Sequence, residues 1–197
     1  MIIQFAEKGN LRRVLSNNFK NILWKEKIEL LFYLSIDLKD LHKSGYLHKD
    51  FHSGNILQII HGSPYVSDFG LSGPANEQKS DDKVYGVMPY IAPEGLNGEQ
   101  YTSSADIYSF GVVMAEISSG KPPFYNKKHD LSLALAICNG LRPEFGKGTP
   151  EFYKKLAYKC MNANSNERPI AAELFDIIYF WNYSNKGEEE FGYKGKE

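Results

Sequence analysis

The stretch His48-Lys49-Asp50-Phe51-His52-Ser53-Gly54-Asn55-Ile56-Leu57 gathers polar side chains directly before a short apolar run. Asn55 follows Asp50 by five residues, and a second motif, Asp68-Phe69-Gly70, opens eighteen residues after Asp50. Between them, residues 56–60 and 65–67 flank His61-Gly62-Ser63-Pro64, and such a turn-forming segment between apolar runs predicts a β-hairpin. The hairpin would fold the chain back and bring Asp50, Asn55 and Asp68 together.

These three side chains suit phosphoryl transfer. The transferred group carries negative charge, which bound metal ions neutralise, and Mg²⁺ prefers oxygen ligands such as those of Asn55 and Asp68. A separate carboxylate must accept the proton of the attacking hydroxyl, and Asp50 is the candidate for this role. Taken singly, each of the three could equally be an ordinary loop or turn residue.

Most of the remaining chain is predicted to be helical. A long helix is indicated by apolar residues at every third or fourth position, namely Ile28, Leu31, Leu34, Leu38 and Leu41. Further helices are expected over residues 103–119, 130–139, 150–162 and 169–181. Ser103 and Asp106 resemble a capping box, and Thr149 resembles an N-cap before a proline at the first helical position.

Composition excludes several classes of protein. Of the 197 residues, 42% are apolar and 24% are charged, and the net charge is −1, which is ordinary for a globular domain. This balance gives no electrostatic reason to expect nucleic acid or an anionic membrane as partner. No window is long enough for a membrane span. The two cysteines suit a reducing compartment, so a cytoplasmic location is expected.

The order of the motifs resembles that of protein kinases, which carry H-R-D-x-x-x-x-N, D-F-G and A-P-E in succession. Here they read His48-Lys49-Asp50 with Asn55, then Asp68-Phe69-Gly70, then Ala92-Pro93-Glu94. The sequence is similar to the tyrosine-kinase-like group of serine/threonine kinases. The resemblance implies a mainly α fold with a small β-hairpin region, a kinase-like C-terminal lobe with its hinge over residues 1–181, and a flexible tail over 182–197.

The resemblance also implies the cofactors ATP and Mg²⁺ and assigns roles to individual residues. Asp50 would be the catalytic base, and Asn55 and Asp68 would hold the metal. Three further residues match positions that surround the adenine, two through backbone groups of the hinge and one beneath the ring: Gln4, Ala6 and Leu57.

A second set of positions would support the site. His48 would pack beneath Phe69, Asp106 would brace the catalytic loop, and Glu94 would form an ion pair with Arg168.

Three positions depart from the family pattern. Lys49 replaces an arginine and loses its bidentate fork. His52 replaces a lysine that contacts phosphate, and Val87 replaces a threonine that bonds to the catalytic loop.

The family's N-terminal lobe, with its Gly-rich loop, is expected to be missing from this chain. We therefore expect a protein kinase that transfers the γ-phosphate of ATP to serine or threonine, or to tyrosine, with a missing N-lobe or a partner kinase completing it. The alternatives are an inactive kinase-like lobe that binds proteins, and a truncated product without function. The protein substrate is unknown.

Overall fold

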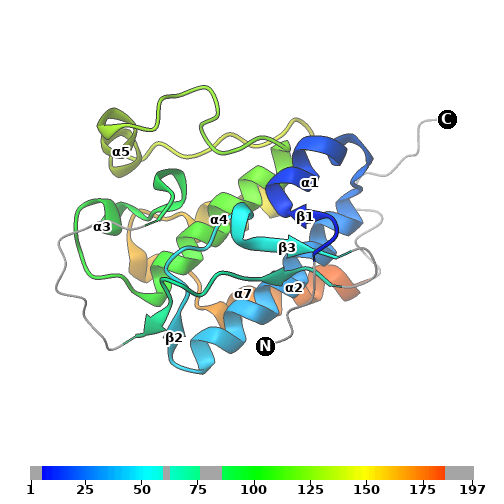
Figure 1. Ribbon diagram of the computed structural model, residues 1–197, viewed down its shortest axis with the longest axis horizontal. Coiled ribbons are helices and arrows are strands. Elements are labelled where there is room, and N and C mark those ends of the chain that lie inside the picture. Colours follow the sequence, from blue (N-terminus) through cyan, green and yellow to red (C-terminus); the bar gives the residue numbers. More distant parts are fainter. Residues whose placement is uncertain (1–5, 60–62, 76–85, 185–197) are drawn as a thin grey trace.

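A computed structural model describes residues 6–59, 63–75 and 86–184 of the protein. The described chain is mainly helical, as predicted, with two small antiparallel sheets. Its longer helices, shown in Figure 1, are α1 (Leu11–Asn18), α2 (Trp24–Lys43), α4 (Ser103–Ser119), α5 (Leu131–Cys138), α6 (Glu151–Cys160) and α7 (Ala171–Tyr183). Shorter segments are α3 (Pro93–Leu96) and the 3₁₀ turns η1 (Phe19–Asn21), η2 (Ser53–Asn55), η3 (Met88–Tyr90) and η4 (Ser165–Glu167).

Helix α4 forms the centre of the core. Every residue from Ala105 to Ser118 is buried, which is the pattern of a helix surrounded by protein on all sides. Helix α6 approaches it closely at Gly111, where an added Cβ would lie 2.8 Å from the Cβ of Cys160. Helices α2 and α7 pack side by side against the same core (Figure 1). Because α4 is packed on all sides, the loop that is bonded to it at His48 and Lys49 has a rigid support.

The predicted hairpin is present and sits beside the candidate site. Strand β3 (Ile56–Gln58) pairs antiparallel with β4 (Tyr65–Val66), with Ile56 opposite Val66. Strand β1 (Gly9–Asn10) adds to the other edge of β3 and gives the order β1-β3-β4. Strand β2 (Tyr46–Leu47) forms a second, two-stranded sheet with β5 (Gly73–Pro74).

Three local predictions need correction. Helix α1 was not predicted; it begins where the Asn10 side chain accepts a hydrogen bond from Arg13 N at 3.0 Å. The capping box of Ser103 and Asp106 is wrong, because Thr102 is the N-cap, without a side-chain bond, and Asp106 turns to other partners. Thr149 is not an N-cap, because its hydroxyl donates to the Gly146 carbonyl at 2.6 Å and the helix begins at Glu151.

Candidate active site

The loop that carries Asp50 is fixed to the core by one buried carboxylate, that of Asp106. The backbone N–H groups of His48 and Lys49 donate to its two oxygens at 2.9 and 3.0 Å. The Tyr101 hydroxyl donates to it at 2.7 Å, and His42 Nε2 lies 2.9 Å away. Because Asp106 is fully buried on α4, its hydrogen bonds hold the loop in a fixed position relative to this core helix.

Lys49 adopts a left-handed backbone conformation, with φ at 66°. Such a conformation costs roughly 1–3 kcal/mol in a residue with a Cβ and persists only where its surroundings impose it. The Asp106 carboxylate supplies that constraint because it binds the Lys49 N–H. Immediately after this turn, the chain presents Asp50 away from the core, with a half-buried side chain.

Asp50 has two side-chain partners on its own loop. The amide of Asn55 donates both to the Asp50 carbonyl and to its Oδ2, each at 3.0 Å. His52 Nε2 lies 3.4 Å from the same Oδ2. The His52 contact, together with the Asn55 bond, holds the pKa of the Asp50 carboxyl below its usual range, against the opposing effect of burial. Asp50 is therefore ionised at neutral pH, as a general base must be.

The neighbours of His52 determine which of its ring nitrogens carries the proton. Its Nδ1 accepts the Gly54 N–H at 2.9 Å, so Nδ1 has no proton in this arrangement. The hydrogen of the neutral ring is then on Nε2, the atom that faces Asp50. The histidine that replaces the expected lysine thus becomes a hydrogen-bond donor to the Asp50 carboxylate.

The chain after Asp68 returns close to Asp50. An added Cβ at Gly86 would lie 3.3 Å from Asp50 Oδ1, and Gly86 has φ of 110°, which other residues rarely adopt. The backbone at Gly86 therefore forms one wall of the space in front of the carboxylate.

Asn55 and Asp68 are brought together by the residue between strand β4 and Asp68. Both the backbone N–H and the hydroxyl of Ser67 donate to the Asn55 carbonyl, at 2.8 and 2.9 Å. The next residue, Asp68, is exposed and has a left-handed φ of 61°. The two hydrogen bonds that Asn55 makes with Asp50 use its nitrogen, so neither engages its Oδ1 oxygen. An amide oxygen and an exposed carboxylate therefore lie on adjoining segments, which suits a hard cation.

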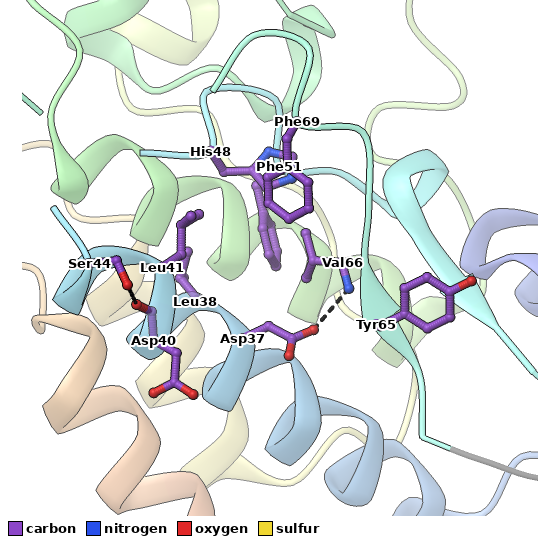
Figure 2. Close-up of a pocket in the computed structure, with 10 residues that line it drawn as sticks. All are labelled: Asp37, Leu38, Asp40, Leu41, Ser44, His48, Phe51, Tyr65, Val66 and Phe69. Carbon is purple, nitrogen blue, oxygen red and sulfur yellow. Dashed lines mark hydrogen bonds between the residues drawn. The ribbon is translucent and has the colours of Figure 1, made fainter. Parts of the chain in front are cut away.

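Aromatic rings support this region from below. Phe69 packs on His48 with ring centroids 5.3 Å apart, His48 meets Phe51 at 5.8 Å, and Phe51 stacks on Phe110 of α4 at 5.7 Å. Figure 2 shows Phe69, His48 and Phe51 grouped above the side chains of α2. The predicted packing of His48 beneath Phe69 is present. Burial lowers the pKa of His48, so its ring is neutral and serves as a packing group.

A cavity of about 370 Å³ opens beside Phe69, a residue that is 54% exposed. Leu38 and Val66 contribute apolar walls, and Asp37 accepts a hydrogen bond from Val66 N at 2.9 Å (Figure 2). Burial raises the pKa of Asp37, although the Val66 bond opposes this effect. Asp50 does not line this cavity, so it lies outside the candidate catalytic centre.

Arg168 and Glu94 form the predicted ion pair. Arg168 Nη1 and Nη2 bind the two Glu94 oxygens at 2.5 and 2.8 Å, a bidentate arrangement. The arginine, which is buried, also donates to the carbonyls of Asn162 and Ser104. The pair therefore ties α3 to the segment that precedes α7.

The expected adenine positions are only partly described. Gln4 lies outside the described residues. The Ala6 carbonyl accepts the Gly9 N–H at 2.9 Å in a turn that leads into β1. Strand β1 then pairs with β3, where Leu57 is opposite Asn10. Ala6 thus lies in the turn before the edge strand β1, and Leu57 lies on the central strand β3 next to it.

The sequence reading missed a buried polar cluster behind Asp50. Glu116 of α4 accepts hydrogen bonds from the hydroxyls of Tyr90, at 2.6 Å, and Ser53, at 2.9 Å. Arg12 of α1 reaches both hydroxyls, at 3.3 and 3.4 Å. Burial raises the pKa of Glu116, while the Tyr90 and Ser53 bonds lower it. A carboxylate at the end of the run Gly111-Val112-Val113-Met114-Ala115 was the signal that could have revealed this cluster.

The described part of the chain carries neither a His, Cys, Asp and Glu cluster for a metal nor a helix that could span a membrane. No group of three or more His, Cys, Asp or Glu side chains there is placed to hold a metal ion. None of the described helices is long and apolar enough to cross a membrane.

Comparison with known proteins places this geometry in context. The family model described as protein tyrosine and serine/threonine kinase matches residues 1–178. A protein of Acanthamoeba polyphaga mimivirus named as a serine/threonine-protein kinase/receptor is 32% identical over 176 residues, which are 88% of this chain and 11% of that protein. A Dictyostelium discoideum protein named as a serine/threonine-protein kinase is 29% identical over 179 residues, 90% of this chain and 11% of that protein.

A Dictyostelium discoideum protein named as a LIM domain-containing serine/threonine-protein kinase is 28% identical over 177 residues, 90% of this chain and 18% of that protein. This chain therefore spans only between a tenth and a fifth of the length of these curated relatives.

Proposed function

Because the chain belongs to the family of protein tyrosine and serine/threonine kinases, we propose that it acts in transfer of the γ-phosphate of ATP to a protein hydroxyl. Serine or threonine is the proposed acceptor, since the relatives described above are named as serine/threonine kinases. Residues 1–181 are proposed as the kinase domain portion, comprising hinge and C-terminal lobe, with 182–197 outside it.

The observation that carries this proposal is the environment of Asp50. Its carboxylate is kept ionised by the Nε2–H of His52 and by the Asn55 amide, on a loop that Asp106 fastens to the core. An ionised, half-buried carboxylate can accept the proton of an incoming hydroxyl as the oxygen attacks phosphorus. The two loop bonds leave the carboxylate little freedom to rotate, so its position is set before the substrate arrives.

Asn55 and Asp68 are proposed to hold Mg²⁺. Both offer hard oxygens, and Ser67 fixes the spacing of their segments through its two bonds to the Asn55 carbonyl. When bound, the metal would neutralise charge on the phosphates.

Gln4, Ala6 and Leu57 are proposed to contact the adenine of ATP. His48, Lys49, Phe69, Glu94, Asp106 and Arg168 are proposed as positioning residues.

Phosphate transfer from labelled Mg-ATP to a generic protein substrate tests the proposal. The assay compares the purified chain with Asp50→Asn, which keeps the size of the side chain but removes its basicity. Asp176→Asn is the matched control, because it makes the same chemical change on an exposed position of α7. Wild type and Asp176→Asn should transfer phosphate at equal rates, and Asp50→Asn should fall by at least about a hundredfold, the usual contribution of a general base.

Transfer by Asp50→Asn at the wild-type rate would refute the role of Asp50. Absence of transfer by the wild-type chain would favour a kinase-like module that binds a partner kinase or substrate. A second measurement separates metal binding from turnover. Mn²⁺ should broaden the backbone amide NMR signals at positions 55 and 68 in the wild-type chain. It should not broaden the signals at the same two positions in an Asn55→Ala, Asp68→Ala double variant.

A further inference from the structure

A groove borders Glu116 and lies between the two chain segments that flank α5. It has a volume of about 310 Å³, and its walls are residues 121–127, which follow α4, and residues 141–147, which follow α5. Figure 1 shows α5 at the periphery, with both of these segments returning toward α4. We call this hollow the basic groove.

The walls of the basic groove are rigid. The Gly146 N–H donates to Ser118 Oγ at 3.2 Å, and its Cα is so close to α4 that an added Cβ would collide with the Ser118 carbonyl at 2.2 Å. Arg142 donates to the carbonyls of Ile137, Leu141 and Met161 at 2.7–2.9 Å. A ligand would therefore meet a largely preformed surface, which reduces the entropy lost on binding.

The other wall contains a strained turn. Phe124 is buried, yet it has φ of 55°, an outlying conformation for a bulky residue. Its consequence is that the next side chain, Tyr125, points outward and is 56% exposed. Lys121 Nζ donates to the Tyr125 hydroxyl at 3.1 Å and lies 4.6 Å from the ring centroid. Strain of this kind is often retained at binding sites, and here it maintains an exposed aromatic ring beside a cation.

The charges along the basic groove are mostly positive. Lys121, Lys127 and Lys147 line it and are exposed, and none of them belongs to an ion pair within the described residues. Glu144 is the exposed acidic residue of the lining, because the Glu116 carboxylate is buried and bound to Ser53 and Tyr90. The local excess of cations contrasts with the chain as a whole, whose net charge is −1.

We propose that the basic groove docks an acidic peptide segment of a partner protein, with an aromatic or aliphatic side chain of the peptide packed against Tyr125. Charge complementarity selects glutamate and aspartate for Lys121, Lys127 and Lys147, and the proline and aromatic surface selects the apolar anchor. This inference does not depend on the catalytic role of Asp50, because docking requires neither nucleotide nor metal.

Fluorescence anisotropy with a short fluorescein-labelled peptide, in which glutamates flank one phenylalanine, tests the proposal. The full chain should bind this probe saturably, and affinity should fall as salt rises, because screening shortens the range of the attraction. Lys127→Glu with Lys147→Glu should weaken binding by roughly tenfold, because two attractive contacts are lost and two repulsive ones are added. Tyr125→Ala should weaken it separately, and Asp50→Asn should bind like wild type.

Lys155→Glu on α6 is the matched control, because it reverses one exposed charge away from the groove. Lys127→Gln gives a milder variant, and thermal melting verifies that every variant is folded. Any of three results would overturn the proposal: no saturable binding, equal binding of a glutamine version of the peptide, or equal loss with Lys155→Glu. Binding of inorganic polyphosphate as tightly as the peptide would also overturn it, since the site would then recognise polyanions in general.

Discussion

Replacing Asp106 with asparagine should destabilise the catalytic loop by more than the loss of one of its hydrogen bonds would. The carboxylate accepts from four donors, two on each oxygen: Lys49 N and Tyr101 OH on Oδ1, and His48 N and His42 Nε2 on Oδ2. An asparagine amide keeps the shape but turns one of the two acceptors into a donor. Whichever way it is oriented, one backbone N–H group then faces another N–H group.

The magnitude follows from this geometry. A hydrogen bond to a charged group contributes about 1.5–3 kcal/mol, and an unpaired buried donor costs about 1–3 kcal/mol. The remaining bonds also weaken because the acceptor has lost its charge. We therefore expect Asp106→Asn to lower the free energy of unfolding by about 2–4 kcal/mol, a large part of the roughly 5–15 kcal/mol of a typical domain. The left-handed turn at Lys49 should relax at the same time.

Urea unfolding followed by circular dichroism measures the global effect, and hydrogen exchange at the His48 and Lys49 amides measures the local one. Tyr101→Phe is the comparison variant, because it removes one donor to the same carboxylate and leaves the other three in place. It should cost about 1.5–3 kcal/mol, the contribution of one hydrogen bond to a charged group. The reasoning is refuted if Asp106→Asn is no less stable than Tyr101→Phe, or if the two amides keep their protection from exchange.

Three further perturbations follow from buried groups elsewhere. Tyr108→Phe should leave stability in thermal melting unchanged or raise it by about 1 kcal/mol, because the buried hydroxyl has no hydrogen-bond partner among the described residues. The ring itself is kept, with Arg142 and Arg168 each 5.2 Å from its centroid, so a clear loss of stability would disprove this. Glu94→Ala should lower the free energy of urea unfolding by about 3–5 kcal/mol, since it leaves the buried Arg168 guanidinium without its carboxylate. A loss below about 1 kcal/mol would contradict a stabilising ion pair at this position. Burial lowers the pKa of Lys27 from 10.5 to about 8. Between pH 8 and pH 10.5 the unfolded chain therefore binds more protons than the folded chain, and the free energy of unfolding should rise with pH over this range. Lys27→Met should remove that rise, and parallel pH profiles of wild type and variant would count against it.

Much of the site was predictable because the relevant residues are close together in sequence. Asp50 and Asn55 lie on one loop, and the hairpin of β3 and β4 returns the chain to Ser67 beside Asn55. Local turn signals were therefore enough to predict that the segments carrying Asp50, Asn55 and Asp68 adjoin. The ion pair of Glu94 with Arg168 spans distant segments, and only the resemblance to kinases predicted it. Gln4 lies outside the described residues, and the roles of the remaining site residues stay predictions until they are tested.

Other features could not be predicted from local pattern. Helix α1 was missed because only Leu11 and Leu15 of its residues are buried, which is too short a repeat to recognise. Asp106 was assigned to a capping box, although its carboxylate is held by donors up to 64 residues away in sequence, which no local rule takes into account. The sequence shows only that His52 replaces a lysine of the family pattern, whereas the bond from Gly54 N–H shows which of its ring nitrogens carries the proton.

The sequence by itself determined the family and the mainly helical fold, because motif order and apolar spacing are properties of the linear chain. Tertiary structure alone decided how these residues work together: the ionised state of Asp50, the buried cluster around Glu116 and the basic groove beside Tyr125. The physical reason is that pKa values, hydrogen-bond partners and surface charge depend on distances through space. Those distances are set by packing around α4, which joins segments that are far apart in sequence.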